Sequence, residues 1–242
     1  MAVINFRGNL PPLNNTTRFT MVAPDILPED RRKWRVLWLL GDDGRFSDDM
    51  LRRIDAEALS VRMNAAIVMP EGLHSDYENM VRGLPWYDYV TKGLPEYIRS
   101  IFPVSDRRED NFVFGAGMGG LGAFRMALRD PQSACAFGCC GPEDLELFAD
   151  DEAHSDPAFI HRMQTIYGDD FRTDEIKRAS DPLTMAENAE KVPAMLICGG
   201  SAAANIAGVL SHKSDDVTYI PASGQNDLLT SLYTFARIVD RW

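Results

Sequence analysis

Short apolar runs alternate along the chain with longer stretches in which apolar positions recur at helical spacing. The runs predict buried strands, because a strand covered on both faces needs no polar positions. They occupy residues 18–22, 34–40, 65–70, 111–114, 134–141, 193–200 and 217–222. The longer stretches predict helices over residues 47–62, 86–102, 121–128, 157–167 and 227–242. Strands that alternate with helices indicate an α/β fold with a mostly parallel, doubly wound sheet.

Three segments refine this pattern. Ser47 is expected to cap the first helix, and Pro95 is expected to kink or break the second. Residues 142–190 are polar and irregular apart from one or two helices, and they predict a cap-like insertion beside the site. No internal repeat or low-complexity linker is visible, so residues 1–242 are expected to form a single domain.

The acidic charge of the chain narrows its partners. The formal net charge is −11, which disfavours nucleic acid and anionic membranes because both require a basic face. No apolar run reaches the length of about 18 residues that predicts a transmembrane helix. Residues 1–9 lack the apolar segment of a signal peptide, so we expect a cytoplasmic location. Whether the chain forms a homo-oligomer stays open.

The cysteines do not form a recognisable site. They lie in apolar, strand-like runs, which is typical of buried free thiols. Two of them are adjacent, and no spaced Cys/His quartet is present, so we expect neither a metal site nor a cofactor. The four positions are Cys135, Cys139, Cys140 and Cys198.

A glycine-rich motif links the predicted strand at 111–114 to the helix that follows. Gly115-Ala116-Gly117-Met118-Gly119 has the context of a nucleophile elbow, whose pattern is G-x-S-x-G. The middle residue is Gly117, which has no side chain to attack a carbonyl. The same glycines could be taken for a dinucleotide loop, but they lack the G-x-G-x-x-G spacing and an acidic ribose contact.

The sequence around this motif resembles a known family. "YVTKGLPEYIRSIFPVSDRREDNFVFGAGMGGLGAFRMAL" is similar to the core of the tributyrin esterase, S-formylglutathione hydrolase and esterase D-like group, which are α/β-hydrolases. "MAVINFRG", "VLWLLGD" and "AIVMPEG" also resemble family segments, so the resemblance covers nearly the whole chain. It implies a carboxylesterase in which a Ser attacks, a His takes its proton and an Asp orients the His.

The catalytic positions implied by the resemblance hold residues without that chemistry. The nucleophile position is Gly117, the acid position falls near Ala202, and the base position falls on Asn226. Gln225 is the alternative register for the base, and a family His beside the oxyanion loop reads Leu40. The segment 199–217 also looks shortened relative to the family. We therefore expect a chain whose triad is lost and which is catalytically deficient.

Other residues are weak substitutes for the missing triad. No histidine follows the last predicted strand, where the base belongs, and a surface or structural role is expected for each of the four, His74, His154, His161 and His212. Ser201 could face the cleft, but no base is evident beside it. Cys198 lies inside a strand. The alternative interpretation, an active hydrolase of short acyl or acylated-sugar esters that uses relocated residues, stays open.

The elbow could still bind a ligand without hydrolysis. The Met118 N–H heads a helix, and an N–H from Gly41 or Asp42 is expected to complete an oxyanion hole for a small anion, a carboxylate or another small molecule. Asp42 and Asp43 oppose such an anion by their charge. The alternative, in which these amides bind only water, stays open.

Overall fold

The computed structural model describes residues 1–24, 33–42, 47–140, 156–222 and 227–239. Its eight described strands form one mixed sheet in the order β1-β2-β4-β3-β5-β6-β7-β8. The two pairings β1–β2 and β2–β4 are antiparallel, and all the others are parallel. The strands, in sheet order, are Ala2–Leu10, Asn15–Ala23, Ala65–Pro70, Arg35–Leu40, Asn111–Ala116, Ala136–Cys140, Ala194–Gly199 and Val217–Pro221.

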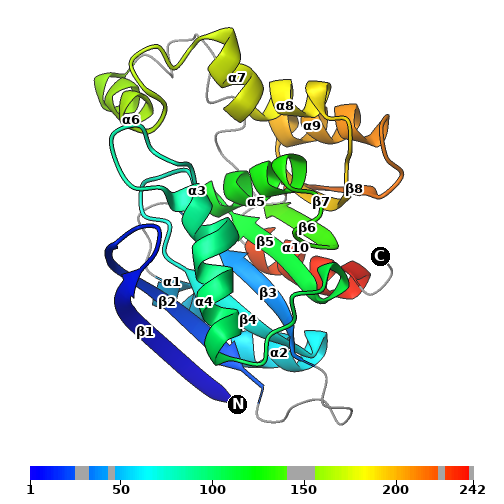
Figure 1. Ribbon diagram of the computed structural model, residues 1–242. Helices are drawn as coiled ribbons and strands as arrows, with labels where there is room; N and C mark the ends of the chain where they lie inside the picture. The colour runs from blue at the N-terminus through cyan, green and yellow to red at the C-terminus, as the bar shows by residue number, and fades with distance from the viewer. Residues whose placement is uncertain (25–32, 43–46, 141–155, 223–226, 240–242) are drawn as a thin grey trace.

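Helices cover both faces of this sheet and make a three-layered α/β architecture (Figure 1). One face packs against α3, α4, α5, α8 and α9 through a core that includes Ile98, Phe124 and Ile206. The opposite face packs against α1, α2 and α10 through a second core that includes Leu59 and Phe235. The α-helices α1 to α10 span Ser47–Arg53, Ala56–Met63, Trp86–Asp88, Leu94–Ile101, Met118–Arg129, Pro157–Tyr167, Asp174–Ser180, Pro182–Asn188, Ser201–Ser211 and Asp227–Ile238.

The apolar runs predicted the central strands closely. The mostly parallel sheet is confirmed, and β4 and α6 have the predicted bounds. The strand β1 was missed, although its inward positions alternate, because its outward side is exposed. Phe6 of β1 stacks on Phe19 of β2 with ring centroids 4.7 Å apart, which fastens this edge strand to the sheet.

Three helix predictions needed correction. The single helix expected over 47–62 is two helices, because the Asp55 side chain accepts a hydrogen bond from the Ala58 N–H at 3.0 Å and begins α2. Ser47 is the first residue of α1. The interruption expected at Pro95 is a π-helical turn, η1 (Tyr89–Gly93), after which Pro95 lies in the first turn of α4.

The helix α9 was also missed. Its sequence begins Ser-Ala-Ala-Ala, and alanine has the highest helix propensity of all residues. It follows β7 directly and connects it to β8. Within the described residues, no helix combines the length and the apolar character that a membrane crossing requires.

Candidate functional site

The glycine motif forms the tight turn between β5 and α5. Gly117 has φ 56° and ψ −125°, a left-handed backbone conformation that residues with a Cβ rarely adopt. Its N–H donates to the Cys140 carbonyl at 2.9 Å, and its carbonyl accepts from the Leu121 N–H at 3.2 Å. The turn therefore retains the geometry of a nucleophile elbow, with Gly117 where the nucleophile would stand.

Two further glycines let the start of α5 approach the sheet. A Cβ on Gly115 would overlap the backbone carbonyl of Gly119, and a Cβ on Gly119 would overlap the carbonyl of Leu40. Because both obstacles are backbone atoms, they cannot move aside as a side chain can. The first turn of α5 is thus packed against the carboxyl ends of β3 and β5 by the absence of side chains.

The Asp42 carboxylate lies over the elbow. Its Oδ1 accepts a hydrogen bond from the Met118 N–H at 3.2 Å, and a Cβ placed on Gly117 would overlap the same oxygen. A carboxylate at this end of α5 is favoured by the partial positive charge of the helix N-terminus. The amide that was expected to serve an anion therefore already binds a carboxylate of this chain. The loop Gly41–Asp42 contacts Met118 through a side-chain acceptor, whereas the expectation was a backbone N–H donor from this loop.

Tyr77 supports the loop that carries Asp42. Its hydroxyl donates to the Gly41 carbonyl at 3.2 Å, and the buried ring packs so closely on α5 that a Cβ on Gly122 would clash with it. Tyr77 itself has φ 53°, and Leu73 and Asp76 in the same segment also have positive φ. Such backbone conformations cost free energy and persist only where surrounding contacts enforce them.

A buried ionic cluster supplies those contacts on the far side of the segment. We call Asp76, Glu78, Arg125, Arg129 and Tyr167 the Arg125 cluster. Arg125 is fully buried in α5, donates to the Asp76 and Ser180 carbonyls at 2.8 and 3.0 Å, and lies 3.2 Å from Glu78 Oε1. Arg129 binds both oxygens of Glu78, at 2.8 and 2.5 Å. Every buried charge here has a partner, as a low-dielectric interior requires.

The pKa directions follow from this pairing. Burial alone would raise the pKa of Glu78, but Arg125 and Arg129 together outweigh it and hold that pKa below its ordinary value. Burial raises the pKa of Tyr167, whose hydroxyl accepts from Arg125 Nη2 at 2.6 Å and donates to Asp76 Oδ2 at 3.2 Å. Arg162 of α6 also pairs with Asp76. The cluster thereby joins α5, the 71–80 segment and α6.

The remaining candidate residues are scattered or lie outside the described residues. Ala202 lies half-buried in the first turn of α9, Ser201 is the exposed first residue of that helix, and Leu40 is buried at the end of β3. His74, His161 and His212 are exposed. The other candidates lie outside the described residues: Asp43, His154, Gln225 and Asn226.

The cysteines are buried free thiols. Burial raises the pKa of Cys135 to about 11, and it raises the pKa of Cys139 further. A thiol with a raised pKa carries little thiolate at neutral pH and is a poor nucleophile. The part of the chain that the structure describes contains no cluster of His, Cys, Asp or Glu that could hold a metal ion.

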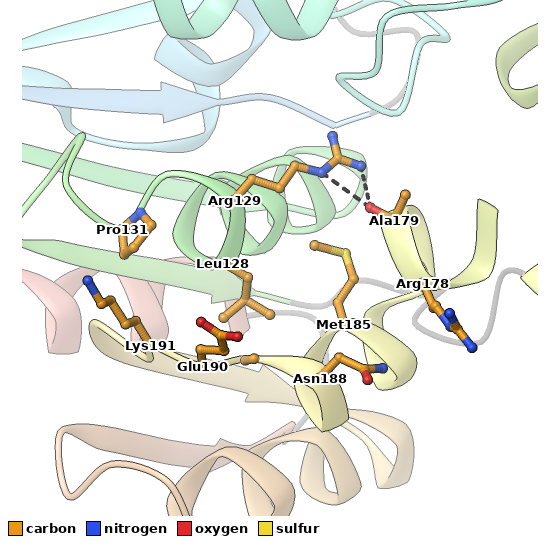
Figure 2. A pocket seen from close by; sticks show the side chains of 10 residues that line it. Leu128, Arg129, Pro131, Arg178, Ala179, Met185, Asn188, Glu190 and Lys191 are labelled. Carbon is orange, nitrogen blue, oxygen red and sulfur yellow. Dashed lines mark hydrogen bonds between the residues drawn. The ribbon is translucent and has the colours of Figure 1, made fainter. Parts of the chain in front are cut away.

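A cavity of about 580 Å³ lies away from the elbow, between the end of α5, α7 and α8. Figure 2 shows Leu128 and Met185 in the middle of its lining, with Arg178 and Lys191 near opposite ends. The Arg129 guanidinium on its wall is held by the Ala179 carbonyl, at 3.2 Å from Nε and 2.6 Å from Nη2, and by Glu78. Arg129 thus already donates hydrogen bonds within the protein, and the other cations of the lining, Arg178 and Lys191, are exposed.

Comparison with known proteins shows which proteins this chain resembles. A family model described as "Esterase: Putative esterase" matches residues 24–142. An acetyl esterase of Caldicellulosiruptor saccharolyticus is 30% identical over 135 residues, which are 52% of this chain and 50% of the relative. An S-formylglutathione hydrolase of Bos taurus is 45% identical over 60 residues, which are 23% of this chain and 21% of the relative.

Residues 24–142 are thus similar to the esterase family. The fold of the chain also agrees with that of the fluorophosphonate-binding serine hydrolase FphF of Staphylococcus aureus, with a TM-score of 0.79 and 22% identity over 99% of this chain and 97% of that one. The chain spans about half the length of the acetyl esterase and about a fifth of the length of the S-formylglutathione hydrolase. The activity and substrates of those relatives are therefore not carried over with the fold.

The sequence alone did not reveal two parts of the site. From sequence, the charge of Asp42 predicts repulsion of an anion at the elbow, whereas its carboxylate accepts a hydrogen bond from the Met118 N–H. The Arg125 cluster was missed altogether, although one signal was present: Arg125 interrupts the otherwise apolar run "LGAFRMAL". A charge on the buried face of a predicted helix indicates a buried partner.

Proposed function

We propose that this protein uses the esterase scaffold for binding or structure and does not hydrolyse esters. The contact between Asp42 and the elbow carries the proposal. An attacking hydroxyl at position 117 and an oxyanion at the Met118 N–H would both need space that Asp42 Oδ1 occupies. Loss of a nucleophile alone removes most of the rate of such an enzyme, by about 10⁴- to 10⁶-fold.

The small anion expected at the elbow belongs to the same proposal. An external carboxylate competes with Asp42 for the Met118 N–H, so the native site binds it weakly and the Asp42→Ala variant binds it better. We further propose that α6, α7 and α8 form the cap-like part of the domain, held on α5 by the Arg125 cluster. The cytoplasmic location and the oligomeric state stay predictions.

Steady-state hydrolysis of p-nitrophenyl acetate and butyrate tests the catalytic part. We expect the native chain to show no turnover above buffer and no labelling by a fluorophosphonate probe, which requires an activated serine. Turnover that disappears in the Ser201→Ala variant would support the relocated hydrolase and overturn the proposal. Turnover that survives in Ser201→Ala but is lost on labelling would place the nucleophile elsewhere and overturn it equally.

A titration with acetate tests the anion part. The Met118 amide resonance reports the site directly, and it should move with acetate at much lower concentration in Asp42→Ala than in the native chain. Asp55→Ala, which removes the capping carboxylate of α2, is the matched control and should leave the Met118 response unchanged. An equal response in the native chain and in Asp42→Ala would show that Asp42 does not close the site.

A further inference from the structure

The 71–80 segment lies between α6 and the loop over the elbow and contacts both. On one side, the Asp76 carboxylate pairs with Arg162 of α6. On the other side, the Tyr77 hydroxyl donates to the Gly41 carbonyl at 3.2 Å. Asp76 and Tyr77 are consecutive residues, so the contact made by α6 and the support of the loop depend on the same stretch of backbone.

The backbone of this segment is held in conformations that its residues do not favour. Leu73, Asp76 and Tyr77 have φ angles of 45°, 51° and 53°, in the left-handed region where a Cβ is unfavourable. Such angles persist only where surrounding contacts enforce them. The loss of an enforcing contact therefore favours a relaxed backbone, which gives the segment two arrangements.

The Tyr77 ring connects this backbone to the elbow. It is buried, and it packs so closely that a Cβ on Gly72 or on Gly122 of α5 would overlap it. A ring with so little free space moves with its own backbone. When the backbone relaxes, the hydroxyl leaves the Gly41 carbonyl, and the loop that carries Asp42 loses this support.

The helix α6 rests on a small core of its own. Met163 and Ile166 of α6 pack with Leu121 and Phe171 in a hydrophobic cluster that is separate from the two cores covering the sheet. Figure 1 shows α6 at the margin of the molecule, away from the sheet. A helix held by a small apolar cluster opens at a lower free energy than the elements of a main core. The helix can therefore be released while the sheet stays folded.

We propose that the docking of α6 controls the elbow through the 71–80 segment. With α6 docked, Arg162 holds Asp76 and the strained backbone is enforced. Tyr77 then keeps the Asp42 loop in place, and the N–H that begins α5 stays covered. With α6 released, the backbone relaxes and this N–H becomes available to an external anion. The inference rests on the proposed function, because it assigns regulation to the anion site that Asp42 covers.

Hydrogen exchange of the full chain, measured by NMR without any ligand, tests the proposal. The Met118 amide reports the contact over the elbow, and the Leu121 amide, whose acceptor is the Gly117 carbonyl, reports the opening of α5 itself. We expect the ratio of the Met118 rate to the Leu121 rate to rise by about fivefold or more in Tyr77→Phe and in Arg162→Met. General destabilisation would raise both rates together, and an unchanged ratio would overturn the proposal.

Matched variants separate this route from a general loosening of α6. Arg82→Met breaks the exposed pair with Asp169, which also joins the chain beside the segment to the chain after α6. Tyr89→Phe removes another buried tyrosine hydroxyl. Both controls should keep the native ratio. A rise in Arg82→Met equal to that in Arg162→Met would show loosening without a specific route and overturn the proposal.

A second variant of α6 keeps the test valid if Arg162→Met fails to fold. Tyr167→Phe removes the other contact of α6 with Asp76, in which the Tyr167 hydroxyl donates to Asp76 Oδ2 at 3.2 Å. The exchange ratio should rise in this variant as well. A rise in Tyr77→Phe with no rise in any folded variant of α6 would show that the loop is braced independently of α6, which would refute the regulation.

The Asp42→Ala background shows whether the route ends at this carboxylate. With the acceptor absent, the Met118 amide should exchange at the same rate whether residue 77 is Tyr or Phe. A further rise of about fivefold on adding Tyr77→Phe would show that the ring acts on α5 directly, and it would contradict the proposal. Because exchange requires neither an ester nor an anion, ester turnover by the native chain would overturn the proposed function without changing these ratios.

Discussion

Two regions of α5 pack against their surroundings in opposite ways. At the start of the helix, close approach depends on residues that have no side chain, with Gly117 and Gly119 against backbone carbonyls and one carboxylate. Two turns later, the Arg125 cluster fills its space with large charged side chains that satisfy each other. The first region has the shape of a nucleophile elbow, with no side chain at position 117. The second holds the surrounding segments in place and is not part of the elbow. Shape and anchoring are thus separable within one helix.

Removal of the central cation of the cluster should have the largest effect. Arg125→Met leaves Glu78 and the Asp76 and Ser180 carbonyls without their buried donor, so we expect the free energy of unfolding to fall by about 3–5 kcal/mol. Urea denaturation measures it. Arg62→Met, on the exposed face of α2, is the control and should change stability by less than about 0.5 kcal/mol. A loss below about 1 kcal/mol for Arg125→Met would show that the cluster is not an anchor.

A methyl group at the start of the helix should come next. Gly119→Ala places its Cβ against the Leu40 carbonyl and forces α5 away from the sheet, at a cost of about 1–3 kcal/mol in unfolding free energy. Gly200→Ala is the control, because nothing lies within 4 Å of a Cβ there. Equal stability of the two variants would mean that the helix shifts freely and that the close packing is unimportant.

The contact between Gly117 and Asp42 can be isolated by a double-mutant cycle. Gly117→Ala should destabilise by about 1–3 kcal/mol through backbone strain and overlap with the Asp42 carboxylate. Asp42→Ala should cost about 0.5–1.5 kcal/mol through loss of the Met118 hydrogen bond. In the double variant the overlap is absent, so its cost should be less than the sum of the two. Strict additivity would show that Asp42 does not lie over Gly117.

The smallest expected effect is the loss of unfolding free energy at low pH. Because the folded-state pKa of Glu78 lies below its ordinary value of 4.5, its contribution to stability is present above that pH and is lost as the pH falls through the folded pKa. Unfolding free energies measured from roughly pH 6 down to pH 3 should therefore fall more steeply for the native chain than for Glu78→Gln. Parallel curves would show that Arg125 and Arg129 do not depend on the charge of Glu78.

The sequence predicted the parts of the fold in which local pattern and burial agree. Continuous apolar runs such as "AAIVMP" indicate a buried strand, and the glycines from position 115 onward indicate a tight turn between strand and helix. The strand β1 was harder to predict because half of its positions are exposed. The helix α9 was harder because it lies in the segment 199–217, which looks shortened relative to the family. In both segments a usable signal was present but was outweighed.

The site was less predictable because its contacts join distant segments. Asp42 and Met118 lie 76 positions apart, and Arg125 and Ser180 lie 55 apart. Nothing in the residues around Asp42 shows whether its carboxylate turns toward the helix or toward solvent. Periodicity describes which face of an element is buried, whereas partner choice within the core depends on three-dimensional packing. The charge of Arg125 was the single local clue.

Because the Asp42 carboxylate lies over Gly117, the order in which these two residues are mutated matters. A hydroxyl restored at position 117 meets the carboxylate and the unfavourable backbone first, and gains nothing until a base and an acid are also in place. If Asp42 changes first, one hydrogen bond is lost but the space reopens. Any stepwise route to a serine at position 117 therefore begins with a loss of stability, and only the route through Asp42 avoids a collision. The contact therefore constrains the order in which these two residues can change, apart from its effect on any ligand.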